Sequence, residues 1–551
     1  MSLKGYYEAS LCPPAADDVL AAAPVAIKWD WGEVLLDHAA YMVDKKNHTS
    51  ARCRFRMNVL NSREVEMRVT LCLAPPPLVS HFCCHAHYTD GHGEEDTCLF
   101  CDEPSMFAME GELALITLCH GEFPPSPIDD NKNYYEYLVY RAGEEELTRL
   151  PHPAPAMLPN RRSHCFNSTA IVVVPYSSKI FTHTRPHKIS QGDDACDAYK
   201  IAALGKDFFH DFANGPHFLC IYDSKTRAWT RKAGAVPQPL PSPSDFISDT
   251  AITIGGSSGG IVGWVDLWSG MLLSDVLADD TPFHLFRYVS LPKPRQPPNW
   301  LPLAVDIVTA FRDIVLVKET GIIRFVDLQV HAEPGPCSET PSGWTVVTWT
   351  LEGFRRDSET LGDMRFRPEH EVHSCDIENY NLPQSVFVSY PILSSHKDGI
   401  LYLRTTVSST TDRNSRVIAD DIKNKKLLKV GEFDMRRPNT YRRTTISSYL
   451  KPPLSKETMK RPAPVSLGSS SQEAAEAACL HYVGDAEGGQ GDVGDAIVPW
   501  TGLTIDDLFG YGCLRGQYHH YGFFAFNPCQ PTIREHGESV CLCFLVTPSV
   551  P

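Results

Sequence analysis

Short apolar runs separated by turn residues recur along most of the chain. They are rich in Val, Ile, Tyr and Trp, and each has the length of a strand, which favours β-structure over helix. The clearest runs are 64–73, 113–119, 135–140, 170–174, 217–222, 261–267, 313–317, 322–326, 345–350, 385–390 and 400–404. The pattern therefore predicts a protein built mainly from strands.

Two segments have a pattern that favours helix instead, residues 194–204 and residues 471–480. The second is alanine-rich and lies within a stretch, 455–497, that is rich in Lys, Pro, Ser, Gly and acidic residues. Such a composition cannot bury enough apolar surface to fold, so we interpret 455–497 as a disordered insertion.

A turn pattern recurs in the strand-rich region. Asp266 ends an apolar run and is followed by a small polar residue at +3 and a large one at +6, and the same spacing starts at Asp223 and at Asp421. A weaker copy starts at Arg141. An Asp carboxylate accepts hydrogen bonds from N–H groups two or three residues on, so each Asp is interpreted first as a turn former.

The spacing of these turns bears on the architecture. Asp223 and Asp266 are 43 residues apart, and Arg141 and Asp223 are 82 apart, which is close to twice that interval. A period of about 40–50 residues with several strands per period is typical of a β-propeller. We therefore predict an all-β, irregular propeller-like fold of about five to seven blades, with tandem β-sandwich domains as the alternative.

The expected organisation has four parts. Residues 1–26 form a tail, 27–454 the propeller-like domain, 455–497 the disordered insertion and 498–551 a C-terminal segment. Within the last part, the run CLCFLV at 541–546 has the character of a strand that could return to close the fold.

Charge is unevenly distributed along an acidic chain. The net charge is −16, which argues against a protein that coats nucleic acid or an anionic membrane with its whole surface. Residues 422–461 nevertheless hold twelve Lys or Arg and three acidic residues, whereas 472–507 hold eight acidic residues and no Lys or Arg. A basic strip and an acidic stretch of this kind can neutralise each other.

Cysteine content and apolar run length bear on the compartment. Eighteen cysteines among 551 residues are far below the density of a disulfide scaffold. No secretory signal is recognised at the N-terminus, and no apolar run approaches the roughly 20 residues of a membrane span. We expect an intracellular protein, cytoplasmic or nuclear, with free thiols, no cofactor and no membrane partner.

A histidine- and cysteine-rich stretch at 81–101 is the most serious candidate for chemistry. The pair Cys98 and Cys101 has zinc-like spacing, and possible further ligands lie upstream at Cys83, Cys84 and His87. The structural interpretation is that 78–87 is a strand with alternating buried Cys and His, and we favour it. A G-x-S-x-G match at 255–260 lacks the helix that a nucleophile elbow requires, so we expect no catalytic residue there.

Two further features have both a structural and a functional interpretation. Arg436, Arg437, Arg442 and Arg443 form a basic patch that could bind nucleic acid, although a solvated loop is the simpler interpretation. The tryptophans of WVDLW, residues 264–268, are four positions apart and are expected to face the same side, in the core or in a ligand-binding aromatic face.

The stretch GWVDLWSGMLLSDVL followed by FRYVSLPKP resembles the plant family called domain of unknown function 1618. The family core W-V-D-L-W-x-G corresponds here to Trp264, Asp266, Trp268 and Gly270, and the core region spans about 261–430. Met271 stands where the family usually has Ile. Upstream, LCLAPPPLVSHF and EVLLDHAAYMVDKKNHTSA are also similar to the family, so the likeness covers most of residues 27–430.

The resemblance implies no reaction and no required Cys/His set, and it suggests a role in plant development or stress response. Propellers present loops around a channel mouth, which suits partner binding. The sequence thus favours a non-enzymatic scaffold for an unknown protein partner. A zinc-binding protein or metal-dependent enzyme that uses 81–101, and a nucleic-acid binder that uses 422–461, remain the alternatives.

Overall fold

The computed structural model describes the strand-rich part of the chain between the two terminal regions. The described residues are 6, 8–14, 31–56, 63–89, 99–120, 134–153, 166–177, 198–206, 217–235, 246–255, 259–278, 283–294, 308–333, 340–353, 364–378, 386–406, 414–434 and 441–450. The expectations for 455–497, 471–480 and 541–546 lie outside these residues.

Five sheets of the described chain are each built from consecutive, mostly antiparallel strands. The first contains β5 (Ser105–Glu110), β6 (Leu113–His120), β7 (Tyr134–Arg141) and β8 (Thr148–Arg149). The second contains β9 (Ile171–Tyr176), β10 (Ala198–Lys206), β11 (His217–Asp223) and β12 (Ala228–Ala235), with β16 (Phe283–Leu285) parallel to β12 at the edge. The third contains β13 (Thr250–Gly255), β14 (Ile261–Asp266), β15 (Gly270–Asp275) and β17 (Arg287–Ser290).

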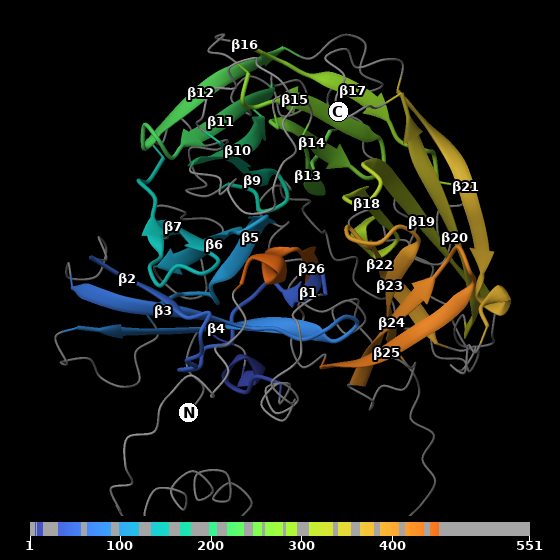
Figure 1. The fold of residues 1–551 in the computed structure, drawn as a ribbon, viewed down its shortest axis with the longest axis horizontal. Coiled ribbons are helices and arrows are strands. Elements are labelled where there is room, and N and C mark those ends of the chain that lie inside the picture. Colours follow the sequence, from blue (N-terminus) through green and yellow to red (C-terminus); the bar gives the residue numbers. More distant parts are fainter. Residues whose placement is uncertain are drawn as a thin grey trace, which may run out of the picture.

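The remaining two of these five sheets follow in the same manner. The fourth contains β18 (Arg312–Val317), β19 (Ile322–Glu333), β20 (Thr340–Glu352) and β21 (Arg365–His373). The fifth contains β22 (Phe387–Leu393), β23 (Ile400–Thr406), β24 (Asn414–Asp421) and β25 (Lys426–Asp434). In Figure 1 the first strand of each sheet faces the middle of the molecule and the last strand lies at its periphery.

A sixth sheet joins strands from the two ends of the described chain, and we call it the closure sheet. Its order is β2 (Ala51–Arg56), β3 (Glu64–Cys72), β4 (Val79–Tyr88), β1 (Val34–Asp37) and β26 (Tyr441–Thr444). β1 runs parallel to β4 and antiparallel to β26, with Val34 opposite Thr444. Because β26 follows the fifth sheet in the chain, this pairing brings the last described strand back to the first.

Six apolar clusters lie between the sheets and complete the ring. Each of them combines buried side chains from two neighbouring sheets, from the closure sheet through the five others and back to the closure sheet. The sixth cluster contains Leu35 and Tyr441 of the closure sheet with Tyr402 and Val417 of the fifth sheet. Tandem sandwiches would give each pair of sheets a core of its own, whereas here every sheet shares apolar surface with two neighbours.

The all-β prediction is therefore confirmed, and the described sheets form a propeller-like ring of six blades (Figure 1). Because the strands are buried on both faces of each sheet, their sequences are continuous apolar runs. In β9, Ile171 and Val173 pack into the cluster with the first sheet, while Val172 and Val174 pack into the cluster with the third.

The helix predicted at 194–204 is wrong. Its described part forms β10, a central strand that pairs with β9 on one side and β11 on the other. Alternate residues of β10 enter two clusters: Ile201 packs against the first sheet and Ala202 against the third. Neighbouring strands on both sides override the helix propensity of alanine, because strand preference depends on tertiary context.

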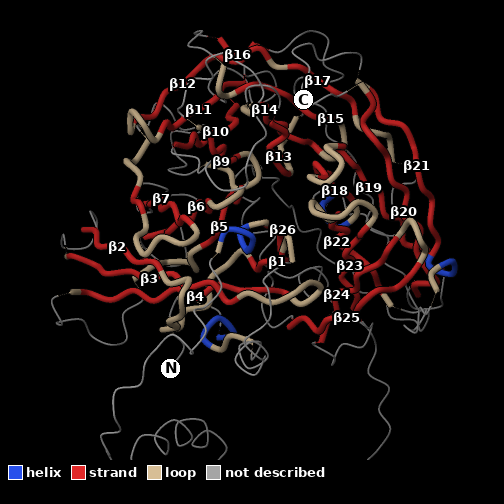
Figure 2. Tube along the Cα trace, in the orientation of Figure 1, coloured by secondary structure: helices blue, strands red, loops and turns tan. Residues whose placement is uncertain are grey.

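The described helices are short 3₁₀ turns, seen as small blue segments among the red strands in Figure 2. They are η1 (Glu8–Leu11), η5 (Val308–Ala310), η6 (Ser374–Asp376) and η7 (Ile446–Tyr449). Within the described ranges, no helix has the length and apolar character needed to cross a membrane.

Candidate functional site

The WVDLW segment forms the end of β14 and the turn into β15. Asp266 Oδ1 accepts hydrogen bonds from the N–H of Trp268 at 2.9 Å and of Ser269 at 3.0 Å. The N–H of Leu267 donates to Asp249 Oδ2 at 2.8 Å. Gly270 is held close to Tyr288, whose ring lies 2.4 Å from the position that a Cβ on Gly270 would take. Asp266 Oδ1 thus shapes the turn by binding two backbone N–H groups.

The two tryptophans of this segment do not face the same side, so that expectation is wrong. Trp264 is fully buried between the second and third sheets, where its Nε1–H donates to the Ala170 carbonyl at 2.9 Å. Trp268 packs instead against the cluster between the third and fourth sheets. The alternation of side chains holds only within a strand, and β14 ends at Asp266.

The other two Asp copies have the same local chemistry. The N–H of Lys225 donates to Asp223 Oδ1 at 2.9 Å. Asp421 Oδ1 accepts from the N–H of Lys423 at 3.1 Å and of Asn424 at 3.0 Å. Asp223 ends β11 and Asp421 ends β24, so the two turns lead into β12 and β25, each of which pairs with the strand before it.

The cysteines and histidine predicted from 81–101 are not brought together as one ligand set. Cys83 and Cys84 are neighbours on β4 and therefore point to opposite faces of the closure sheet. His87 is exposed, and its ring centroid lies 5.4 Å from that of His85. Cys98 lies outside the described residues. Cys101 is buried beside Cys119, with 2.8 Å between the two Sγ atoms.

The structure instead groups Cys83 with His81, which opens the same 81–101 stretch, and with Cys72, which lies outside it. In the described part of the chain these three form a group that could hold a metal ion. Cys72 belongs to β3 and lies opposite His81 in the register of β3 and β4. Strand pairing was the missing signal, because a hairpin register cannot be inferred from Cys spacing alone.

The predicted basic patch is divided. Arg442 and Arg443 belong to β26 and make contacts inside the ring. Arg442 Nη1 donates to the Phe107 carbonyl at 2.9 Å, and Arg443 donates to the Asp313 carboxylate and the Ile314 carbonyl. These two arginines therefore tie the closure sheet to the first and fourth sheets. Arg436 and Arg437 lie outside the described residues.

The most exposed large apolar side chains of a described strand lie on β25, the outer edge of the fifth sheet (Figure 1). Leu428 and Val430 are each 45% exposed. The exposed lysines 426 and 429 alternate with them, and neither has an ion-pair partner among the described residues. An isolated bridge joins Glu378 to the start of this edge, and residues 428–434 pair with no described strand other than β24.

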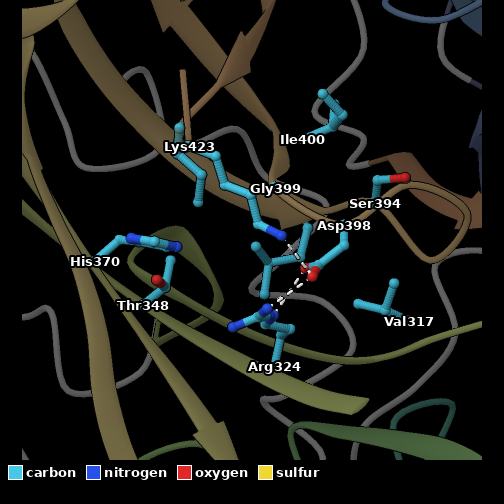
Figure 3. Close-up of a pocket in the computed structure, with 11 residues that line it drawn as sticks. Val317, Arg324, Thr348, His370, Ser394, Asp398, Gly399, Ile400 and Lys423 are labelled. Carbon is cyan, nitrogen blue, oxygen red and sulfur yellow. Dashed lines mark hydrogen bonds and ion pairs between the residues drawn. The ribbon is translucent and has the colours of Figure 1, made fainter. Parts of the chain in front are cut away.

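A small cavity lies between the fourth and fifth sheets (Figure 3). Arg324 and Lys423 converge there on Asp398: the guanidinium donates at 2.8 and 2.7 Å, and Lys423 Nζ lies 2.7 Å from Oδ2. Thr348 and His370 form the opposite wall. The cavity measures about 10 Å³, which is room for about one water molecule.

Charge and burial set the protonation of this cavity. Burial raises the pKa of Asp398, but the hydrogen bonds from Arg324 and Lys423 outweigh it, and the pKa lies below its ordinary value. Burial and the Arg324 charge lower the pKa of His370. The carboxylate is therefore ionised and fully paired at neutral pH, which is typical of a structural ion pair.

A second buried arginine lies at the other side of the fourth sheet. Arg312 donates to both carboxylate oxygens of Asp327, at 3.3 and 3.0 Å, and to the carbonyls of Leu267 at 2.9 Å and Pro292 at 3.3 Å. Its guanidinium also lies 5.2 Å from the Trp268 ring centroid. Arg312 therefore fixes the WVDLW turn against β18 and β19.

The central part of the chain matches a model of a known protein family. Residues 264–402 match the model of the family described as "Protein of unknown function (DUF1618)". The matched segment starts within β14 and ends within β23, so it includes the WVDLW turn, the whole fourth sheet and both buried arginines. The family resemblance read from the sequence is confirmed.

None of the curated proteins compared with the chain matches it. Among solved structures, the chain is similar to a mutant of an α-L-arabinofuranosidase from Fusarium graminearum in complex with an iminosugar inhibitor. That match has 7% identity and a TM-score of 0.23, and it covers 60% of this chain and 81% of the other. A likeness of this size carries no argument about function.

Proposed function

We propose that this chain, which belongs to the DUF1618 family through residues 264–402, is a non-enzymatic protein-interaction scaffold. It binds an extended, acidic segment of a partner protein along the edge strand β25. The observation that supports this proposal is the exposure of Leu428 and Val430 on a sheet edge that, over 428–430, pairs with no described strand other than β24. An unpaired edge offers backbone N–H and C=O groups to an added strand.

The chemistry of the partner follows from the side chains along this edge. Lys426 and Lys429 are exposed beside the apolar pair, so acidic residues that alternate with apolar ones complement the strand. The outer edge of the fourth sheet, β21, offers a contrast, because it contains Pro368 and the charged residues Arg367 and Glu369. Proline and charge are the usual means by which proteins block such an edge.

Cross-linking of the full-length chain in cells or native extract tests the proposal. A carbodiimide, which joins a lysine amine to a carboxylate, followed by mass spectrometry is expected to link an acidic partner peptide to Lys426 or Lys429. The double variant Leu428→Asp, Val430→Asp is expected to reduce that product at least about tenfold, because charge at a buried interface position costs roughly 2 kcal/mol or more. Ile247→Asp is the matched control, since Ile247 is 52% exposed on another blade.

Three results would overturn the proposal. The first is a cross-linked partner whose yield is the same in the double variant and in Ile247→Asp. The second is a cross-link from β25 to the chain's own acidic stretch 472–507, which would make that stretch the occupant. The third is salt-dependent binding of nucleic acid that disappears when Lys426 and Lys429 are neutralised.

A further inference from the structure

Cys72, His81 and Cys83 converge on one face of the closure sheet. Cys72 and His81 are direct partners across β3 and β4, and Cys83 follows His81 by two positions and therefore shares its face. One possible ligand atom from each residue lies within 4.8 Å of those of the other two. None of the three side chains is more than 4% exposed. Two hairpin strands thus bring three soft ligands to one buried point.

His81 is the unusual member of this group. It is 2% exposed, and among the described residues neither of its ring nitrogens makes a hydrogen bond of good geometry, although the Cys72 thiol lies beside the ring. Tyr41 packs edge-on at 5.1 Å between ring centroids, which is an aromatic contact. A buried polar group without a partner costs about 1–3 kcal/mol, and native structures usually supply a water or an ion in such places.

The two thiols complement that imidazole. Cys72 contacts both Cys83 and His81 within this buried group. Without a metal ion, two neutral thiols would share the buried site with the imidazole. A divalent ion that displaces two thiol protons would be held by two thiolates and one imidazole nitrogen, which satisfies all three side chains at once.

We propose that Cys72, His81 and Cys83 bind one zinc ion. Zinc takes cysteine sulfur and histidine nitrogen as ligands, and three protein ligands leave one position of a tetrahedral shell for water or a small anion. Because the site joins β3 to β4 within the closure sheet, the ion stabilises the blade in which the ring closes. The site does not depend on the proposed binding along β25.

The metal content of the purified full-length chain tests this proposal. Protein produced with zinc in the medium and purified without chelator is expected to contain about one zinc ion per chain by plasma mass spectrometry. Cys72→Ser, His81→Ala and Cys83→Ser are each expected to lose it. Replacement of zinc by cobalt should give a thiolate-to-cobalt charge-transfer band, which reports sulfur ligands directly.

Two cysteine variants serve as matched controls. Cys84 is the neighbour of Cys83, equally buried, but it packs into the apolar cluster on the other face of the sheet. Cys101 belongs to the thiol pair with Cys119 and tests adventitious binding there. Cys84→Ser and Cys101→Ser are expected to retain zinc, and its loss in either, with retention in Cys72→Ser, would overturn the assignment.

Substitutions in a buried strand pair can prevent folding, so an independent measurement is made on the wild-type chain. Metal-free protein, prepared with a chelator under native conditions, is expected to gain thermal stability when zinc is returned and to release protons as the thiols ionise. Cobalt-substituted wild type with no charge-transfer band would contradict the proposal. So would a chain that stays metal-free in excess zinc, or that takes up only copper.

Discussion

Two arginine–aspartate pairs hold the fourth sheet to its neighbours, one on each side. Arg312 and Asp327 fix the turn of the third sheet, and Arg324 and Asp398 fix a turn of the fifth. Both pairs are bidentate. The Arg312 side chain is 1% exposed and lies among backbone carbonyls and aromatic rings, whereas Arg324 borders the small cavity of Figure 3.

The difference lies in what remains when the arginine is removed. Without Arg312, the Asp327 carboxylate would lose both guanidinium hydrogen bonds at a position where its side chain is 7% exposed. Asp398 also accepts from Lys423, which is 37% exposed, and the Glu369 that contacts Arg324 is 34% exposed. Breaking the same kind of ion pair is therefore expected to cost different amounts of folding free energy on the two sides of the fourth sheet. Burial and alternative partners set that cost.

The largest effect is expected from Arg312→Met. It removes the bidentate partner of the buried Asp327 carboxylate and frees the Leu267 carbonyl, so the free energy of unfolding should fall by about 3–5 kcal/mol. Urea unfolding followed by tryptophan fluorescence measures this loss. The double variant Arg312→Met, Asp327→Leu removes both charges and should recover part of it. A single variant as stable as wild type would show that the pair has no structural role.

A smaller effect is expected from Arg324→Met. Asp398 keeps Lys423, and Glu369 can turn to solvent, so the loss should be about 1–2 kcal/mol in the same unfolding experiment. The comparison between the two sides fails if Arg324→Met destabilises the chain as much as Arg312→Met does. Asp398→Asn is the companion variant, which keeps the shape of the side chain and removes its charge.

The smallest effect is expected from Lys423→Met. A partly exposed ion pair contributes about 0.5 kcal/mol or less at neutral pH. Its effect should be clearer in acid: the pKa of Asp398 is lowered in the folded chain, so this carboxylate stabilises the fold above its ordinary pKa, and that contribution is lost as the pH falls. Without Lys423 the loss should begin at a higher pH. Unfolding curves from pH 7 down to about pH 2 measure the shift, and identical acid profiles would contradict it.

Much of the fold could be predicted from local patterns. Strand runs such as 171–174 are apolar on both faces, and Asp266 lies at the end of a run where a turn is needed, so element type and turn positions were accessible. The strand within residues 194–204 could not be predicted in this way, because an alanine-rich strand between two others has no local signature. Arg324 and Asp398 are 74 positions apart, and only the packing of two blades brings them together.

The candidate metal group shows the same limit. The sequence drew attention to Cys83, but Cys72 lies eleven positions upstream and outside the cluster that was considered. Only the register of β3 and β4 places it opposite His81. The family match gives a further lesson, since it starts inside β14 and ends inside β23. The matched segment therefore cuts two sheets and does not correspond to an integral number of blades.

The pairing of β1 with β26 also decides how the ring responds to force. Val34, where the chain enters β1, lies opposite Thr444, where the chain leaves β26. Tension applied from both flanks of the ring would therefore load one end of this seam, and the hydrogen bonds between the two strands would break one after another rather than together. Strands that unzip in this way separate at low force. We therefore expect the pairing of β1 with β26 to be the first part of the ring to open under tension.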